Sequence, residues 1–308
     1  MRDPKPTPKP KSKSKEPVAA PPALGDISIR PVEVQRMLDP TLGVAPAPSP
    51  GDGDWLAEHE ETPQTFDDYV RTVANVPTPQ RHTLYLLPLG TFPRDASPSL
   101  DALQSIVHAY FTLDVRVLPA AALRDVAAKS RINDATHKRQ LLAPDVLRWL
   151  TSHLPDDAYA LMAVTMDDLY PEPSWNYVFG MASLQERVGV QSFARQDPAF
   201  FGDPRTPGWR ALALRRAART LIHEISHMFG MSHCTFYACV VAGSNNEAEA
   251  DRGPLHACPV DLHKLWWAIR FDPIARESAL AATWRTLGFA DEAAYYDARV
   301  RYIRDGTR

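Results

Sequence analysis

The stretch LIHEISHMFGMSHCTFYAC, residues 221–239, decides how the rest of the chain is arranged. It contains His223 and His227, four positions apart, so on a helix both imidazoles reach one point on one face. Gly230 follows where the helix should stop, because glycine tolerates the left-handed turn needed there. That turn brings back His233 as a third nitrogen donor. Three histidines leave the fourth position of a tetrahedral Zn²⁺ open, which is the layout of a catalytic zinc site.

Glu224 directly follows the first histidine, and its carboxylate can reach a water held at the predicted zinc. The pattern therefore predicts zinc-assisted peptide hydrolysis, in which Zn²⁺ polarises the scissile carbonyl and lowers the pKa of its water toward about 7. Glu224 would be the general base that takes the proton of the zinc-bound water and later delivers it to the leaving amine. The sequence identifies no group that stabilises the oxyanion, and Tyr237 is a candidate by nearness alone.

The spacing His-Glu-x-x-His-x-x-Gly-x-x-His matches the metzincin pattern. Cys234 follows the third histidine directly, and Cys239 and Cys258 come after it. With these residues the chain resembles the archaemetzincins, a metzincin family of zinc metallopeptidases with a second, cysteine-rich zinc site after the catalytic helix. The resemblance covers about 80–271 and is weaker from about 54. It implies one catalytic zinc ion, a second structural zinc ion and a peptide or protein substrate.

The chain departs from the family pattern at two positions. Val241 stands where the family has the methionine that forms the floor beneath the zinc, and Asp261 stands at the position of the fourth cysteine. A structural zinc normally takes four protein ligands, and a carboxylate can serve as one. The resemblance thus implies a second site of the three cysteines and Asp261. His256 or His263 as fourth ligand, and the absence of a stable second zinc, stay open as alternatives.

The composition limits the class of protein. Of 308 residues, 44% are hydrophobic and 23% charged, the net charge is −3 and the pI is near 6.4, so nothing indicates a nucleic-acid or membrane partner. No run of eighteen apolar residues occurs, and the N-terminus has no apolar core of a signal peptide. All three cysteines lie within 234–258, which favours metal ligation in a reducing compartment. We expect a cytoplasmic protein; the sequence does not determine its oligomeric state.

The domain organisation follows from the distribution of proline. Residues 1–53 read as a disordered, Pro-rich tail whose first part, 1–25, is basic. Residues 54–308 are expected to form a metzincin-like catalytic domain. Its N-terminal subdomain would cover about 54–230 and its C-terminal subdomain 231–308.

Hydrophobic periodicity predicts alternating strands and helices. A helix starting at Ser97 separates two strands, which suggests a parallel βαβ pair, and a second helix is expected over Lys138–Leu154, where Pro144 would split it. Within Ile27–Leu38 we expect a short strand and a helix on the main body. The expected strands are Thr83–Leu89, Asp114–Leu118, Tyr159–Thr165 and two runs within 177–194. The family resemblance implies that part of 177–194 is an edge strand that pairs with the peptide substrate, and a plain hairpin without a ligand is the alternative.

The long helix before Gly230 has a wide apolar stripe, and Arg215, Arg216 and Arg219 lie off it and read as a solvated face. Helices are also expected after Cys258, at about 273–287 and at 291–304. Together these elements predict an α+β fold: a metzincin-like, mixed and mostly parallel sheet, the active-site helix packed on it, and a C-terminal helical subdomain.

Two other functions remain to be distinguished from a peptidase. One is a non-catalytic, zinc-stabilised peptide-binding protein, against which the intact Glu224 argues. The other is a zinc hydrolase of a non-peptide amide. Carboxylates that orient the metal-bound histidines are expected, and Glu249 and Asp251 are candidates by nearness in sequence.

Overall fold

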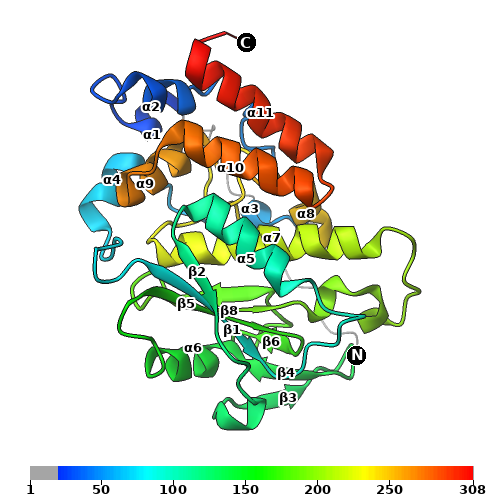
Figure 1. Ribbon diagram of the computed structural model, residues 1–308. Coiled ribbons are helices and arrows are strands. Elements are labelled where there is room, and N and C mark those ends of the chain that lie inside the picture. Colours follow the sequence, from blue (N-terminus) through cyan, green and yellow to red (C-terminus); the bar gives the residue numbers. More distant parts are fainter. Residues whose placement is uncertain (1–19, 308) are drawn as a thin grey trace, which may run out of the picture.

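The computed structural model describes residues 20–307, and Figure 1 shows a sheet on one side of a long helix and a group of helices on the other. The long helix is α7 (Trp209–Met228), which carries His223 and His227 near its C-terminal end. The basic tail expected over 1–25 lies mostly outside the described residues. No helix among the described residues is both long and apolar enough to cross a bilayer.

The larger sheet has the strand order β2-β1-β5-β8-β7. The first four strands are parallel to one another, and β7 at the edge runs antiparallel to β8. The runs TLYLLPL and AYALMAVT are buried along their whole length, as parallel strands covered on both faces should be. The strands are β1 (Thr83–Leu89), β2 (Asp114–Val117), β5 (Ala158–Thr165), β7 (Gly180–Ala182) and β8 (Val188–Ser192).

Helices cover both faces of this sheet because successive side chains of each strand point to opposite faces. In β1, Leu84 and Leu86 belong to the core shared with α5 (Leu100–Phe111) and α7, whereas Leu87 belongs to the core shared with α6 (Ala143–Thr151). The expected βαβ pair is confirmed by the parallel ladder of β1 and β2. The helix of this pair is capped two residues later than expected. The hydroxyl of Ser99, and not that of Ser97, accepts a hydrogen bond from the Ala102 N–H in the first turn.

A smaller sheet replaces part of an expected helix. Its order is β3-β4-β6, with β3 (Ser130–Ile132), β4 (Arg139–Leu142) and β6 (Asp168–Tyr170). The helix expected over 138–154 is therefore wrong in its first part. Pro144 lies in the first turn of α6 and does not split it, because a proline there lacks only an N–H that has no helical partner.

The N-terminal residues within the description pack on the helical half. Four short helices precede β1: α1 (Ala20–Leu24), α2 (Val32–Met37), α3 (Trp55–Glu58) and α4 (Phe66–Thr72). Met37 and Leu38 are fully buried, so the tail expected over 1–53 does not describe residues 20–53. The strand expected within 27–38 is not formed. Thr65 caps α4, because its hydroxyl accepts a hydrogen bond from the Asp68 N–H.

The C-terminal residues form a helical layer on the other side of α7 (Figure 1). Its helices are α8 (Glu247–Arg252), α9 (Pro259–Ile269), α10 (Pro273–Thr286) and α11 (Ala290–Asp305). Short 3₁₀ turns lie at Leu123–Asp125, Ala194–Gln196 and Pro198–Phe201. The α+β fold with a mixed, mostly parallel sheet and a helical C-terminal part is confirmed; the proposed subdomain boundaries stay predictions.

The three arginines of α7 that were expected on a solvated face are buried or paired with carboxylates. Arg219, expected in solvent, is only 5% exposed. Arg215 and Arg216 pair with carboxylates of the helical layer, Glu292 and Asp251 respectively. The apolar stripe alone could not reveal this, because α8 and α11 cover a face of α7 that carries arginines.

Candidate active site and metal centres

The three predicted histidines meet at one point. The Nε2 atoms of His223 and His227 are 3.0 Å apart, and one ring nitrogen from each of these two and from His233 lies within 4.8 Å of the others. α7 supplies the first two rings at helical spacing. Gly230, with φ of +82°, then turns the chain so that His233 returns to the same point. We call these three residues the histidine cluster.

Backbone carbonyls fix the rings of the two helical histidines. Nδ1 of His223 lies 3.0 Å from the carbonyl oxygen of Val240, and Nδ1 of His227 lies 2.6 Å from that of Met231. A proton on each Nδ1 leaves Nε2 with a free lone pair, as metal ligation requires. Burial lowers the pKa of His227 to about 4, and burial together with the charges of His227 and His233 lowers the pKa of His223 well below its usual value. Both rings are therefore neutral at pH 7.

A carboxylate fixes the third ring. Nδ1 of His233 lies 2.6 Å from Oε1 of Glu61, and the same oxygen accepts a hydrogen bond from the Trp55 indole at 2.7 Å. Partial burial acts to raise the pKa of Glu61, but the hydrogen bonds from His233 and Trp55 outweigh it and hold the pKa below its ordinary value. Glu61 stays ionised and aims His233 at the cluster. No motif in the sequence points to Glu61, which lies 172 positions from its partner His233.

The two carboxylates expected to orient the histidines have other partners. Asp251 binds Arg216, with oxygen–nitrogen distances of 2.6–3.2 Å. Glu249 accepts from the backbone N–H groups of Trp55 and Asn245 at 2.9 and 2.7 Å. Neither candidate chosen by nearness in sequence bonds a histidine of the cluster, because their carboxylate oxygens are held by these other partners.

Glu224 is 6% exposed and lies beside the histidine cluster in the same cleft. Burial raises its pKa to about 8. The β7 backbone approaches it closely at Gly180, where a Cβ atom would lie 2.5 Å from Oε1 of Glu224. A carboxyl group so held can exchange a proton with a molecule bound in the cleft.

The cleft has a volume of about 640 Å³, within the range of small-molecule and peptide sites. The edge strand β7 forms one wall and α7 another, so the histidine cluster opens toward an unpaired strand edge. Tyr237, the candidate for stabilising an oxyanion, is not among the residues that line it. The lining residues include Trp55, Glu61, Trp175, Tyr177, Phe179, Gly180, Met181, Arg219, Thr220, Ser244, Asn245 and Ala250.

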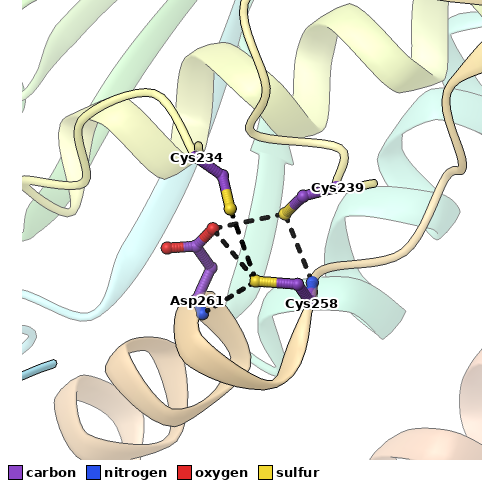
Figure 2. A group of neighbouring side chains, drawn as sticks. All are labelled: Cys234, Cys239, Cys258 and Asp261. Atoms are coloured by element: carbon purple, nitrogen blue, oxygen red, sulfur yellow. Dashed lines mark hydrogen bonds between the residues drawn. The ribbon is translucent and has the colours of Figure 1, made fainter. Parts of the chain in front are cut away.

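A second group of potential ligands lies behind the first. Figure 2 shows the side chains of Cys234, Cys239, Cys258 and Asp261 pointing toward one another, the last two from the start of α9. Their ligand atoms lie within 4.8 Å of one another, and all four residues are buried. We call them the cysteine cluster. Sγ–Sγ and Sγ–O distances of 3.2–3.5 Å are close to the roughly 3.3–3.8 Å between ligands of a tetrahedral zinc.

Neither of the two histidines considered as fourth ligand lies in the cysteine cluster. His256 stacks on Tyr295, and His263 stacks on Phe66, so neither ring joins the cysteine cluster. Oδ1 of Asp261 binds the buried Lys264 ammonium at 2.8 Å, which leaves Oδ2 directed at the thiols.

The cysteine cluster contains four ionisable groups whose pKa values are shifted by burial and by one another. Hydrogen bonds from Cys239 and Cys258 lower the pKa of the Cys234 thiol, whereas burial raises the pKa of the other two thiols and raises that of Asp261 to about 6. A bound Zn²⁺ would lower these raised pKa values and compensate the charge of the thiolates that ligate it. The donors of both clusters, imidazole nitrogens and thiolate sulfurs, are those that zinc prefers.

Val241, where the family resemblance implies a methionine, is fully buried. Its carbonyl accepts from the Cys234 N–H at 3.2 Å, and its N–H lies 3.5 Å from Sγ of Cys239. The preceding carbonyl, of Val240, holds His223. One segment thus connects the two clusters through its backbone, which a change from methionine to valine leaves intact.

Comparison with known proteins gives consistent matches. The family model described as Peptidase family M54 matches residues 115–266. Archaemetzincin-2 of Homo sapiens is 35% identical over 254 residues, 74% of this chain and 71% of that protein. Archaemetzincin-1 of Homo sapiens is 29% identical over 258 residues, 75% of this chain but 52% of that protein. A crystal structure of archaemetzincin from Archaeoglobus fulgidus is 26% identical, covering 59% of this chain and 99% of that one with a TM-score of 0.46.

Proposed function

Because this chain belongs to the archaemetzincin family of zinc metallopeptidases, we propose that it hydrolyses peptide bonds with Glu224 as general base, beside a zinc ion held by the histidine cluster. The observation that carries the proposal is the convergence of three Nε2 atoms whose rings are fixed through Nδ1, with the Glu224 carboxyl group in the same cleft. A zinc ion bound there supplies Lewis acidity and lowers the pKa of water.

Glu224 moves the proton. A carboxylate oxygen takes a proton from the attacking water and delivers it to the amine nitrogen of the leaving peptide. Burial, which raises the pKa of Glu224 to about 8, makes its ionised form a stronger proton acceptor, and a zinc ion bound nearby would favour that ionised form. Gly180 leaves the carboxyl group room beside the backbone of β7, where any side chain would collide with it.

The edge strand β7 orients the substrate. We propose that an extended peptide pairs with it as an additional strand, because β7 is outermost in its sheet and lines the cleft. Backbone pairing recognises no particular sequence, so it is consistent with a broad range of peptides. Trp175 and Tyr177, also in the lining, would contact substrate side chains.

A second, structural zinc ion is proposed for the cysteine cluster, with Asp261 as fourth ligand. Four buried ligands leave no open position, which distinguishes a structural site from a catalytic one. The metzincin-type chain fold and a cytoplasmic location remain parts of the proposal. The location is supported by three free cysteines whose function as metal ligands needs a reducing compartment.

The experiment measures zinc by elemental analysis and hydrolysis of a proteome-derived peptide mixture by mass spectrometry. Wild type should bind two zinc ions per chain and cleave peptides. Glu224→Ala should bind the same amount of zinc and lose at least about 10²–10⁴-fold in rate. Cys258→Ser should bind one zinc ion, and its serine can still cap α9, as the Cys258 side chain does now.

Each outcome tests one assignment. Equal rates for Glu224→Ala and wild type would show that Glu224 is not the base. Unchanged zinc in Cys258→Ser would remove the second site. A zinc-loaded wild type that binds peptides but cleaves none would favour the non-catalytic peptide-binding protein.

A further inference from the structure

Arg219 lies on α7, four positions and therefore one helical turn before His223. Residues with this spacing share a helix face, so Arg219 lies beside the histidine cluster and not behind it. It lines the cleft even though only 5% of the residue is exposed. The site thus contains a nearly buried guanidinium group that neither proton transfer nor metal ligation uses.

This guanidinium has no partner of its own among residues 20–307. Nε of Arg219 is buried without a hydrogen-bond acceptor, and no carboxylate of these residues forms an ion pair with it. Among the groups that act on it electrostatically, the Cys239 thiol of the cysteine cluster forms no hydrogen bond with it, and the carboxylates of Glu247 and Asp251 pair with Arg216, at 3.5 and 2.6 Å. Arg215, one turn earlier, donates to the Gly253 carbonyl at 3.2 Å. Arg219 is therefore the exception among the three arginines of this face.

A buried charge without a partner is costly, so a position that keeps one is expected to gain an anionic partner at some stage of function. Arginine presents parallel N–H groups that match the two oxygens of a carboxylate. Gly253 leaves space for the group, since a Cβ there would lie 3.0 Å from Nη2 of Arg219. Uncharged polar residues, Thr220, Ser244 and Asn245, also line the cleft, whose carboxylates are those of Glu61, Glu172 and Glu224.

We propose that Arg219 is a specificity-determining residue that binds a carboxylate of the substrate, one or two residues from the peptide bond that is cut. One helical turn is about 5.4 Å, and an extended peptide advances about 3.3 Å per residue. The carboxylate belongs either to the C-terminus of the peptide or to an aspartate or glutamate side chain. This inference rests on the proposed peptidase function and names the substrate class of that same site.

The first test measures binding without turnover. Zinc-loaded Glu224→Ala protein is immobilised and exposed to a proteome-derived peptide library, either untreated or with all carboxyl groups converted to amides. Untreated peptides should be retained about 10- to 100-fold more tightly, the range expected of a hydrogen-bonded charge pair. In the Glu224→Ala protein, the second substitution Arg219→Gln should abolish this preference, whereas Arg219→Lys in its place should keep part of it. Arg215→Gln, on the same helix but with its own partners, is the matched control and should change nothing.

The second test measures cleavage by otherwise wild-type protein. Sites cut in the untreated library should have a carboxylate at one fixed position, and Arg219→Gln should lose that enrichment through a higher KM while kcat changes little. Peptides resynthesised as C-terminal amides, and with Glu replaced by Gln, identify which carboxylate is recognised. The melting temperature of Arg219→Gln should not fall, because no partner is lost.

The two hypotheses fail in different ways. Equal retention of both libraries, or a preference unchanged by Arg219→Gln, overturns the carboxylate site whatever the catalytic result. A preference for untreated peptides in the binding test, together with a zinc-loaded wild type that cuts no peptide, overturns the peptidase function alone. A lower melting temperature with equal losses for both libraries would assign Arg219 to the packing of α7 on α8, against the proposal.

Discussion

Three imidazoles share one point, but their outer nitrogens have different acceptors. The Met231 carbonyl, in the turn after α7, holds His227, and the Val240 carbonyl, 17 positions from His223, holds that ring. His233 is held by the Glu61 carboxylate, which comes from the segment between α3 and α4. A carboxylate on the far nitrogen makes an imidazole a stronger donor and fixes its orientation, so Glu61 should contribute directly to zinc affinity.

Glu61→Gln should therefore weaken zinc binding about 10- to 100-fold, because an amide oxygen accepts the proton without the negative charge. The measurement is competition for zinc with a chelator of known affinity. Glu58→Gln, an exposed glutamate on the neighbouring helix, is the control and should leave the affinity as it is. Identical affinities for Glu61→Gln and wild type would mean that the carbonyl-held histidines alone determine the site.

At the scale of elements, the approach of β7 to α7 shapes the cleft. The strand is the antiparallel edge of a parallel sheet, and it meets the helix where Glu224 lies. The absence of a side chain at Gly180 permits this approach, since a Cβ would lie 2.5–2.7 Å from three atoms of Glu224. The position of the general base is therefore coupled to the position of the strand that is proposed to hold the substrate.

Gly180→Ala should displace the Glu224 carboxyl group and lower the hydrolysis rate by at least about tenfold, because a misplaced catalytic group loses the benefit of its orientation. Zinc content should not change, since no ligand of the histidine cluster touches Gly180. Rates and zinc are measured as for Glu224→Ala. The comparison is Ala182→Gly on the same strand, which adds no atom near Glu224. Full activity in Gly180→Ala would show that the strand and the base move independently.

Across the whole molecule, a buried ionic network connects the helical layer. Glu277 is fully buried and accepts from Arg276 at 2.9 Å and from Arg299 at 2.7 Å. Arg276 also donates to the Tyr110 carbonyl of α5, and Arg299 to the Met37 carbonyl at the end of α2. One carboxylate thus joins α10 and α11 to the sheet side and to the N-terminal segment.

Glu277→Gln should lower the free energy of unfolding by about 3–5 kcal/mol, because it leaves two buried guanidinium groups without a counter-charge. Urea denaturation gives this value. The control, Arg285→Gln, breaks an exposed ion pair with Asp297 between the same two helices and should cost less than about 1 kcal/mol. A loss for Glu277→Gln no larger than that of the control would contradict the role assigned to the network.

The sequence by itself determined the parts of this protein that depend on local geometry. A helix fixes residues four apart on one face, so His223, Glu224 and His227 could be placed before any fold was known. Gly230 gave the turn that returns His233, and the apolar runs of β1 and β5 gave the centre of the sheet. The family resemblance added the cysteine cluster, including Asp261 at the position where a cysteine was expected.

Only the tertiary structure decided which distant residues complete the site. Glu61 was missed because nothing near it in sequence indicates a metal, and Glu249 and Asp251 were chosen wrongly because nearness along the chain does not fix direction in space. The sequence placed Arg219 on a solvated face, but in the folded chain α8 covers it and only 5% of the residue is exposed. Helical spacing is set by backbone hydrogen bonds within a few residues, whereas burial and the pairing of charges depend on how separate segments pack, and no local pattern records that.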